Sequence, residues 1–335
     1  MKSFGSDNHS GIHPNILRAI ERENFGHDLA YGDDSATQRA KELFGKLFGR
    51  EVGVYFVFNG TGANVLSLSC GMESYHSVIC ASTAHINVDE CGAPERQLGC
   101  KVISVESTNG KLTKEAILPH LTNFGFEHHS QPRFLSIAQS TELGTLYTIE
   151  QIRELSELAH SYGMYLHLDG ARIANAVAAM GVELSEMTCG VDVMSFGGTK
   201  NGMMMGEAVV VLNPELDRAM KYKRKQSMQL YSKMRFVAAQ FIEYLSDGLW
   251  LSLASNSNKM AKLLENKIAP YVEITQPVEA NALFCIMDKE LYKKMLEDYF
   301  FYEWDAERGE VRLVCSFDTT EHDIENFANT LISLL

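Results

Sequence analysis

The stretch MYLHLDGARIANAVAAMG, residues 164–181, predicts a buried strand followed by a helix. Residues 164–169 are almost continuously apolar, which is typical of a strand covered on both faces. The preceding predicted helix begins at Thr148 with a T-x-x-Q capping box, repeats apolar residues at helical spacing, and ends at Gly163. A helix, a strand and a second helix in this order predict one unit of a parallel sheet covered by helices.

Strands of this kind alternate with helices over most of residues 50–215. The predicted strands are residues 52–58, 77–82, 100–106, 133–139, 191–198 and 207–213. After Pro214 the pattern changes to long helices at residues 216–267, followed by strands at 281–287 and 310–317 and helices at 289–299 and 321–335. We predict an α/β fold with a large domain, residues 26–245, whose mostly parallel sheet lies between helices. A smaller α+β domain is predicted from residues 1–25 and 246–335.

The composition excludes several classes of partner. Asp and Glu outnumber Lys and Arg by 43 to 30, so the net charge of −13 disfavours a nucleic acid or an anionic membrane as partner. No apolar run approaches the roughly 18 residues of a membrane span, and the start MKSFGSDNHSGIHP lacks the apolar core of a secretory signal. The seven cysteines form no C-x-x-C pair, which predicts reduced thiols and no metal site. We therefore expect a cytoplasmic protein.

The segment MSFGGTKNG, residues 194–202, places Lys200 at the end of a predicted buried strand. Burying an ammonium group without a partner is costly, so the lysine either caps the strand at the surface or has a desolvated, reactive amine. Asp169 ends the preceding predicted strand. Its carboxylate either caps the following helix or pairs with a cationic group.

Two further groups follow predicted strands. In NGTGAN, residues 59–64, Gly60, Thr61 and Gly62 open a helix whose N–H groups attract anions, although a plain tight turn has the same composition. His85 follows the strand at 77–82, where a structural histidine is the alternative.

The carboxyl ends of parallel strands meet at one edge of a sheet, so we expect these four groups to lie together. They match the needs of pyridoxal phosphate (PLP). This cofactor needs a phosphate cradle, a lysine for a Schiff base, an acid beside the pyridinium nitrogen, and a ring stacked on its face.

At these residues the chain resembles the threonine aldolase and β-eliminating lyase family of PLP enzymes, which has the aspartate-aminotransferase type of fold. The matching motifs are SDNHSGIHP, AYGDDSATQRA, NGTGAN, HINVDECGAPE, HLDGARIANA, SFGGTKNG, SKMRF and VRLVCSF. The likeness is greatest to low-specificity L-threonine aldolases and phenylserine-cleaving relatives. It implies retro-aldol cleavage of L-β-hydroxy-α-amino acids, such as L-threonine, L-allo-threonine and phenylserine, to glycine and an aldehyde. Another PLP lyase or an aminotransferase on the same scaffold is the alternative.

The resemblance also implies roles for individual residues. Lys200 holds PLP as a Schiff base, Asp169 pairs with the pyridinium nitrogen, and His85 stacks on the ring. The phosphate is held by Gly60, Thr61 and Gly62. The substrate carboxylate is bound by Ser6, Arg172 and Arg312, with Arg172 also near the cofactor. The candidate groups at the substrate hydroxyl are His85 and His128.

The basic segment at residues 220–235 is the counterpart of one that, in the family, reaches the PLP phosphate of a neighbouring subunit. Lys225 and Arg235 are its candidate contacts, although QSMQLYSKMR is longer here than the family's glycine-rich run. Tyr31 and Asp33 match a substrate-contacting loop. The resemblance therefore implies a homodimer or homotetramer with its active site at a dimer interface.

Overall fold

A mixed sheet of seven strands forms the centre of the protein in this computed structural model, which describes residues 2–335. Its strands, in spatial order, are β2 (Gly53–Val57), β8 (Glu207–Val211), β7 (Val193–Phe196), β6 (Tyr165–Gly170), β5 (Gln131–Ala138), β3 (His76–Ala81) and β4 (Lys101–Val105). Within this sheet β8 runs antiparallel to both of its neighbours, and the other paired strands run parallel. The carboxyl ends of the parallel strands therefore share one edge.

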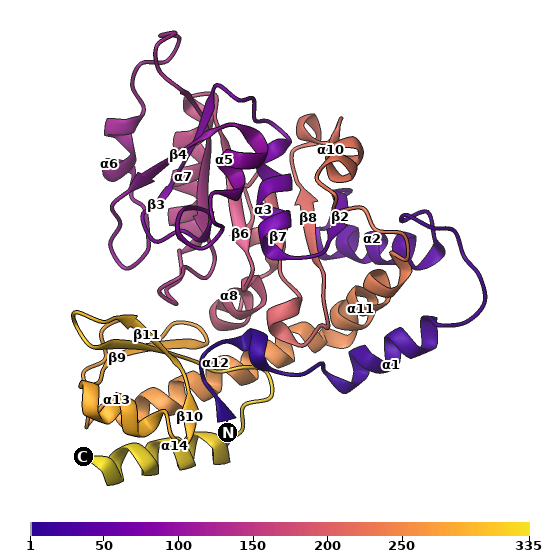
Figure 1. Cartoon of the computed structure of the whole chain (residues 1–335). Coiled ribbons are helices and arrows are strands. Elements are labelled where there is room, and N and C mark those ends of the chain that lie inside the picture. Colours follow the sequence, from indigo (N-terminus) through magenta and orange to yellow (C-terminus); the bar gives the residue numbers. More distant parts are fainter. Residues whose placement is uncertain (1) are drawn as a thin grey trace.

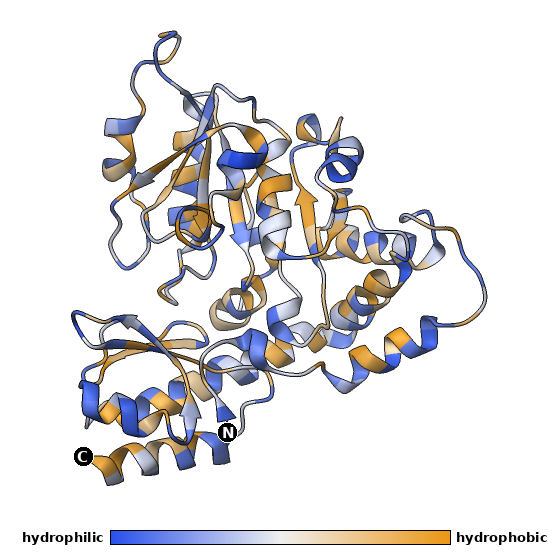
Figure 2. Ribbon diagram, in the orientation of Figure 1, coloured by the Kyte–Doolittle hydropathy of each residue, from blue (hydrophilic) through white to orange (hydrophobic). Residues whose placement is uncertain are grey.

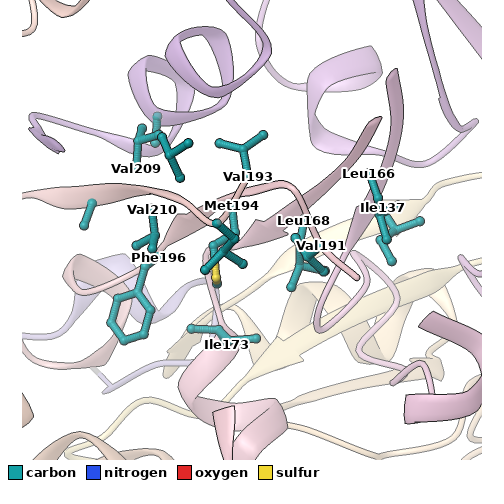
Figure 3. Close-up of a cluster of buried hydrophobic side chains, with 14 of the residues drawn as sticks. Ile137, Leu166, Leu168, Ile173, Val191, Val193, Met194, Phe196, Val209 and Val210 are labelled. Atoms are coloured by element: carbon teal, nitrogen blue, oxygen red, sulfur yellow. The ribbon is translucent and has the colours of Figure 1, made fainter. Parts of the chain in front are cut away.

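Both faces of the sheet are covered. Every residue of β7 and of β8 is buried, and consecutive buried residues on a strand point to opposite faces. Helix α3 (Gly60–Ser69) packs against β7 and β8, and α7 (Ile149–Ser161) packs against β6. Figure 3 shows side chains from β6, β7 and β8 meeting in this core, among them Leu168, Met194 and Val210. The hydropathy colouring in Figure 2 shows the central strands as predominantly hydrophobic and α10 (Met220–Gln226) as hydrophilic.

A second apolar core lies in the C-terminal part of the chain. An antiparallel sheet of β11 (Tyr302–Asp305), β12 (Glu310–Val314) and β9 (Ala282–Ile286) packs with α12 (Leu249–Ile268), α13 (Lys289–Met295) and α14 (Glu321–Leu334) (Figure 1). Strand β1 (Lys2–Ser3) pairs with β10 (Tyr299–Phe300), and Phe4 is fully buried in this core. The N-terminus thus lies beside the C-terminal elements.

Helix α12 joins the two cores. Its first turns place Trp250 and Leu253 in the large core, and its later turns place Leu264 and Ile268 in the second. Ile16 of α1 (Pro14–Glu23) is buried in the large core. The domain boundaries at residues 25 and 245 stay a prediction.

The predicted strands of the central sheet are confirmed, as is the capping box at Thr148 and Gln151. The long helices predicted at 216–267 are three separate helices, α10, α11 (Arg235–Leu245) and α12, of which only α12 is long. Met228 and Asp247 have φ of 61° and 51°, left-handed values that cannot continue a right-handed helix. The helix predicted at 289–299 ends earlier, at Met295, and strand β10 begins at Tyr299. The sequence pattern did not reveal this strand.

The remaining α-helices connect these elements. They are α2 (Ser35–Phe48), α4 (His85–Val88), α5 (Ala93–Leu98), α6 (Lys114–Ile117), α8 (Ile173–Met180) and α9 (Leu184–Met187). No helix within residues 2–335 combines the length and apolarity needed to cross a membrane.

Replacing Phe44 by Ala should destabilise the fold by about 3–5 kcal/mol, because this fully buried ring leaves a cavity that its neighbours cannot fill. Phe44 of α2 meets Phe196 and Phe241 edge-on, at centroid distances of 5.1 and 5.5 Å. Urea unfolding measures the change. The control Tyr271→Ala removes a half-exposed ring and should change stability little. A loss below about 1 kcal/mol in Phe44→Ala would contradict this packing.

Candidate active site

Lys200 lies in a short 3₁₀ turn, Thr199–Asn201, directly after β7. Glycines make this turn possible, since a Cβ at Gly197 would overlap the Ala171 carbonyl group and one at Gly198 would overlap the Met203 sulfur. Within residues 2–335 the Lys200 amine makes no hydrogen bond or ion pair with a side chain or carbonyl group. Burial lowers the pKa of Lys200, and the positive charge of Arg172 lowers it further. The amine is therefore unpartnered and inclined to lose its charge.

Asp169 lies near the end of β6, opposite Ser195 of β7. Its Oδ1 accepts hydrogen bonds from the Ala171 N–H at 2.9 Å and the Ser195 hydroxyl at 3.3 Å. Its Oδ2 accepts one from the Asn64 amide at 2.8 Å. Burial alone would raise the pKa of Asp169, but the nearby His85 charge and the Ala171 N–H outweigh it, so the pKa is lowered. The structure thus keeps a buried carboxylate ionised next to the strand that leads to Lys200.

His85 begins α4, after β3, and is held at two points. Its Nδ1 lies 2.8 Å from Oε1 of Glu90, whose side chain is fully buried. Its backbone N–H donates to Oε1 of Glu142 at 2.9 Å. The hydrogen bond to Glu90 raises the pKa of His85, against the opposing effect of burial. Burial also raises the pKa of Glu142 to about 7.

The NGTGAN segment forms the first turn of α3, as predicted. Asn59 caps the helix and accepts the Gly62 N–H at 2.8 Å. A Cβ at Gly62 would lie 2.5 Å from the Gln229 amide, so the segment after α10 approaches this turn closely and Gln229 would have to move for a larger residue. Gly60 and Thr61 begin a ten-residue helix, whose N-terminal N–H groups and dipole attract an anion such as a phosphate.

Arg172 is held by Asp7 in a bidentate ion pair, with Nε–Oδ2 and Nη2–Oδ1 distances of 2.7 and 2.9 Å. Asp7 is buried and also accepts a hydrogen bond from Asn281 at 3.1 Å. Ser6 precedes Asp7, and its hydroxyl caps the short helix that follows by accepting the Asn8 N–H. The pair with Asp7 uses Nε and one N–H of Nη2, so the other donors of the guanidinium stay available to a carboxylate ligand.

Arg312 of β12 joins the same region from the C-terminal part of the chain. Its Nη2 donates to the Gly5 carbonyl at 3.3 Å, next to Ser6. The guanidinium lies over the Trp304 ring, 5.0 Å from its centroid. Its Nε is buried without a partner. The three residues predicted to bind the substrate carboxylate are therefore linked through the segment at residues 5–7.

Residues of the basic segment cluster with the connection between α1 and α2. The Lys225 amine lies 5.1 Å from the Tyr31 ring centroid, and Arg235 lies near the carbonyl groups of Phe25 and Gly26 at 3.4 and 3.5 Å. Tyr31 also donates its N–H to Ser232 at 2.8 Å. Asp33 belongs to this connection as well. Tyr31, Lys225 and Arg235 therefore lie near one loop, residues 24–34, and none of these contacts involves Lys200.

His128 is not placed with the other predicted residues within one subunit. It lies three residues before β5, at the edge opposite the one where Asp169 pairs with the end of that strand. At roughly 3.3 Å per residue, the length of β5 separates the two edges by about 25 Å. The His128 side chain is largely exposed and near Glu127.

The residues present suit PLP. They provide an unpartnered amine, an ionised carboxylate, a helix N-terminus for a phosphate and an imidazole, and all four follow carboxyl ends of strands or the turns beyond them. No group of three His, Cys, Asp or Glu side chains in the part of the chain described could hold a metal ion.

A family model described as beta-eliminating lyase matches residues 3–290. The chain belongs to the beta-eliminating lyase family. It is 43% identical over 333 residues to a low specificity L-threonine aldolase of a Pseudomonas species, covering 98% of this chain and 96% of the relative. The solved structure of Leishmania major threonine aldolase has a TM-score of 0.95 and 31% identity, covering 100% of this chain and 99% of that one.

The fold is shared more widely. Thermus thermophilus aspartate aminotransferase matches with a TM-score of 0.72 at 14% identity, covering 100% of this chain and 91% of that structure. The sequence motifs predicted the aspartate-aminotransferase type of fold for this beta-eliminating lyase family member, and the prediction is confirmed.

Sequence reasoning missed several buried polar residues of this site. Asp7, Asn64 and Glu142 contact predicted residues that are far away in the sequence. Glu90 lies only five residues after its partner His85. Glu207, at the start of β8, accepts the Gly198 N–H at 2.6 Å in the turn that carries Lys200. Burial raises the pKa of Glu207 to about 7. An acidic residue at the start of an apolar strand was the only available signal.

The free energy of unfolding of Glu207→Gln, relative to that of wild type, should increase as the pH rises. Because its pKa rises from 4.5 to about 7 on folding, Glu207 retains a proton that the unfolded chain releases. Its contribution to stability is complete below pH 4.5 and is lost as the pH passes through about 7. Between about pH 5 and pH 8 the variant should gain about 1–3 kcal/mol over wild type in urea unfolding. The exposed control Glu157→Gln should gain nothing, and a flat difference in both variants would contradict the raised pKa.

Proposed function

We propose that this beta-eliminating lyase family member is a PLP-dependent aldolase that cleaves L-β-hydroxy-α-amino acids to glycine and an aldehyde. The observation that carries the proposal is the unpartnered Lys200 amine, with its lowered pKa, beside the strand whose Asp169 is kept ionised. The name of its Pseudomonas relative, low specificity L-threonine aldolase, supports this reaction and L-threonine as a substrate.

Lys200, Asp169 and His85 would hold the cofactor, with Gly60, Thr61 and Gly62 at its phosphate. When bound, PLP supplies an aldehyde for an amine and a ring that accepts electrons from a bond at the substrate Cα. Asp169 serves this chemistry because the nearby His85 charge and the Ala171 N–H keep it ionised, so it stabilises a protonated ring nitrogen. The lowered pKa of Lys200 favours the neutral amine, which is the nucleophilic form.

Arg172 and Arg312 would bind the substrate carboxylate, with Ser6 beside them. Asp7 fixes the plane of the Arg172 guanidinium, and the Trp304 ring supports that of Arg312. Two guanidinium groups held in fixed orientations restrict rotation about the substrate's Cα, which favours the orientation in which the Cα–Cβ bond breaks.

His85 would accept the proton of the β-hydroxyl, directly or through one water. Its Nδ1 faces Glu90, so its Nε2 is the nitrogen left for substrate. His128 is the second candidate. In its own subunit it lies at the sheet edge opposite Asp169, so it would have to reach the site of a neighbouring subunit.

The protein would act as a homo-oligomer, a dimer or a tetramer, with sites at a subunit interface. Lys225 and Arg235 would reach the cofactor phosphate of a neighbour, and Tyr31 and Asp33 its substrate. Supporting this, exposed apolar side chains lie on the same loop, among them Phe25, which is 90% exposed, and Leu29. We also propose a cytoplasmic location, which the free state of all seven cysteines supports.

Lys200→Ala should abolish both the visible absorbance of the protein reconstituted with PLP and its release of glycine. The variant loses the amine that would attach the cofactor and displace the product from it. Wild type and Lys293→Ala, which removes an exposed lysine, should both release glycine and an aldehyde from L-threonine, L-allo-threonine or phenylserine. Glycine release by Lys200→Ala at the wild-type rate would refute the assignment. Pyruvate formed from a β-substituted alanine, without aldehyde from any hydroxy amino acid, would instead indicate a β-eliminating enzyme.

Arg312→Lys should lower kcat/KM for L-threonine by about 10–100-fold, because an ammonium cannot reproduce the planar, paired hydrogen bonds of a guanidinium. Steady-state kinetics measure this loss, and PLP affinity should stay near that of wild type. Arg308→Lys, at an exposed position before the same strand, is the matched control. Equal loss of PLP binding and turnover in Arg312→Lys would place Arg312 at the cofactor and not at the substrate.

A further inference from the structure

One buried amide lies between two carboxylates of the site. Nδ2 of Asn64, on α3, donates to Oε1 of Glu90 at 2.8 Å and to Oδ2 of Asp169 at 2.8 Å. The same Glu90 oxygen lies 2.8 Å from Nδ1 of His85. Asn64, Glu90 and Asp169 are all buried. A continuous chain of hydrogen bonds therefore runs from the imidazole to the carboxylate, joining residues at or beyond the ends of β2, β3 and β6.

The orientation of this amide is fixed by its neighbours. An NH₂ group has two hydrogens, and Asn64 gives one to each carboxylate. Turning the amide over would place its carbonyl oxygen against two carboxylate oxygens, which repel it. The Asn64 Oδ1 and Glu90 Oε2 atoms are buried without partners, so the arrangement serves the two donated bonds at the expense of these atoms. A catalytic role is one explanation for unsatisfied buried atoms of this kind.

We propose that Asn64 and Glu90 are positioning residues which together set the orientation of the His85 ring and the ionised state of Asp169. This inference rests on the proposed function, since it assigns His85 to the face of the cofactor ring and Asp169 to its nitrogen. Glu90 accepts from Nδ1 of His85, so the ring plane is fixed and Nε2 is left to the reaction side. Asn64 holds Glu90 in place and gives Asp169 a further donor beside the Ala171 N–H and the Ser195 hydroxyl.

Other charged groups face His85 and must be kept constant in a test. Asp169 and Glu90 favour its protonated form and Lys200 opposes it, while Glu142 holds its backbone N–H. A substitution at Glu90 changes one of these influences alone. Position 90 is therefore the better first target, and position 64 tests the link to Asp169.

Glu90→Gln keeps the size of the side chain and removes its charge. In the full-length protein without added PLP, the pKa of His85 measured by NMR should fall by about one unit, since a neighbouring opposite charge favours the protonated ring. The dissociation constant of PLP, measured by absorbance titration, should rise about tenfold. In the reconstituted enzyme the acidic limb of the kcat/KM profile should move with the His85 pKa. Glu90→Asp, which keeps the charge, should restore the His85 pKa in part. Glu95→Gln, an exposed carboxylate on α5, should change none of these values.

Asn64→Leu is the second variant and removes both donated bonds while keeping a side chain of four heavy atoms that branches at Cγ. Circular dichroism confirms its folding, and its PLP affinity should also fall about tenfold. An unchanged His85 pKa in Glu90→Gln, or unchanged PLP affinity in a folded Asn64→Leu, would overturn the inference. If both shifts occur but wild type releases no glycine from any hydroxy amino acid, the positioning role stands and the proposed reaction fails.

Discussion

The structure depends on keeping an amine with a lowered pKa and an ionised carboxylate in the same buried region. Burial disfavours the charged form of both Lys200 and Asp169, and an isolated charge in such a place is costly. The protein resolves this differently at each position. Asp169 receives three hydrogen bonds and stays negative, whereas Lys200 receives none from the described residues and its pKa falls. This difference makes the pair suited to a carbonyl cofactor.

The surrounding segments are arranged to maintain that difference. Asp7 comes from the N-terminus, Arg172 from the loop after β6, and Asn281 from just before β9, and the three are joined by hydrogen bonds. Arg312 reaches the same place from β12. The second core thus contributes a guanidinium to the large sheet's reactive edge. Movement of the C-terminal elements relative to the sheet would move a group that we assign to the substrate.

Much of this was accessible from sequence because it depends on local patterns. Apolar runs gave the strands, and the distinctive residues Lys200, Asp169 and His85 were found by asking which polar groups end such runs. Hydrogen bonds between distant residues leave no local signal, so Asn64 and Asp7 were missed. Glu90 was missed although it lies only five residues after His85. The breaks between α10, α11 and α12 were missed because Met228 and Asp247 adopt left-handed conformations that their residue types do not announce. His128 is a different case, because it precedes the predicted strand at 133–139 and so belongs to the amino-end edge of the sheet, and only the family resemblance assigned it to the site.

The central claim is that the Lys200 amine is the one that attaches the cofactor. The most direct test is to add PLP to the wild-type protein, reduce with borohydride, digest, and locate the modified peptide by mass spectrometry. The account predicts a single phosphopyridoxyl group, on the peptide containing Lys200. Modification at another lysine with none at Lys200, or no modification at all, would contradict it.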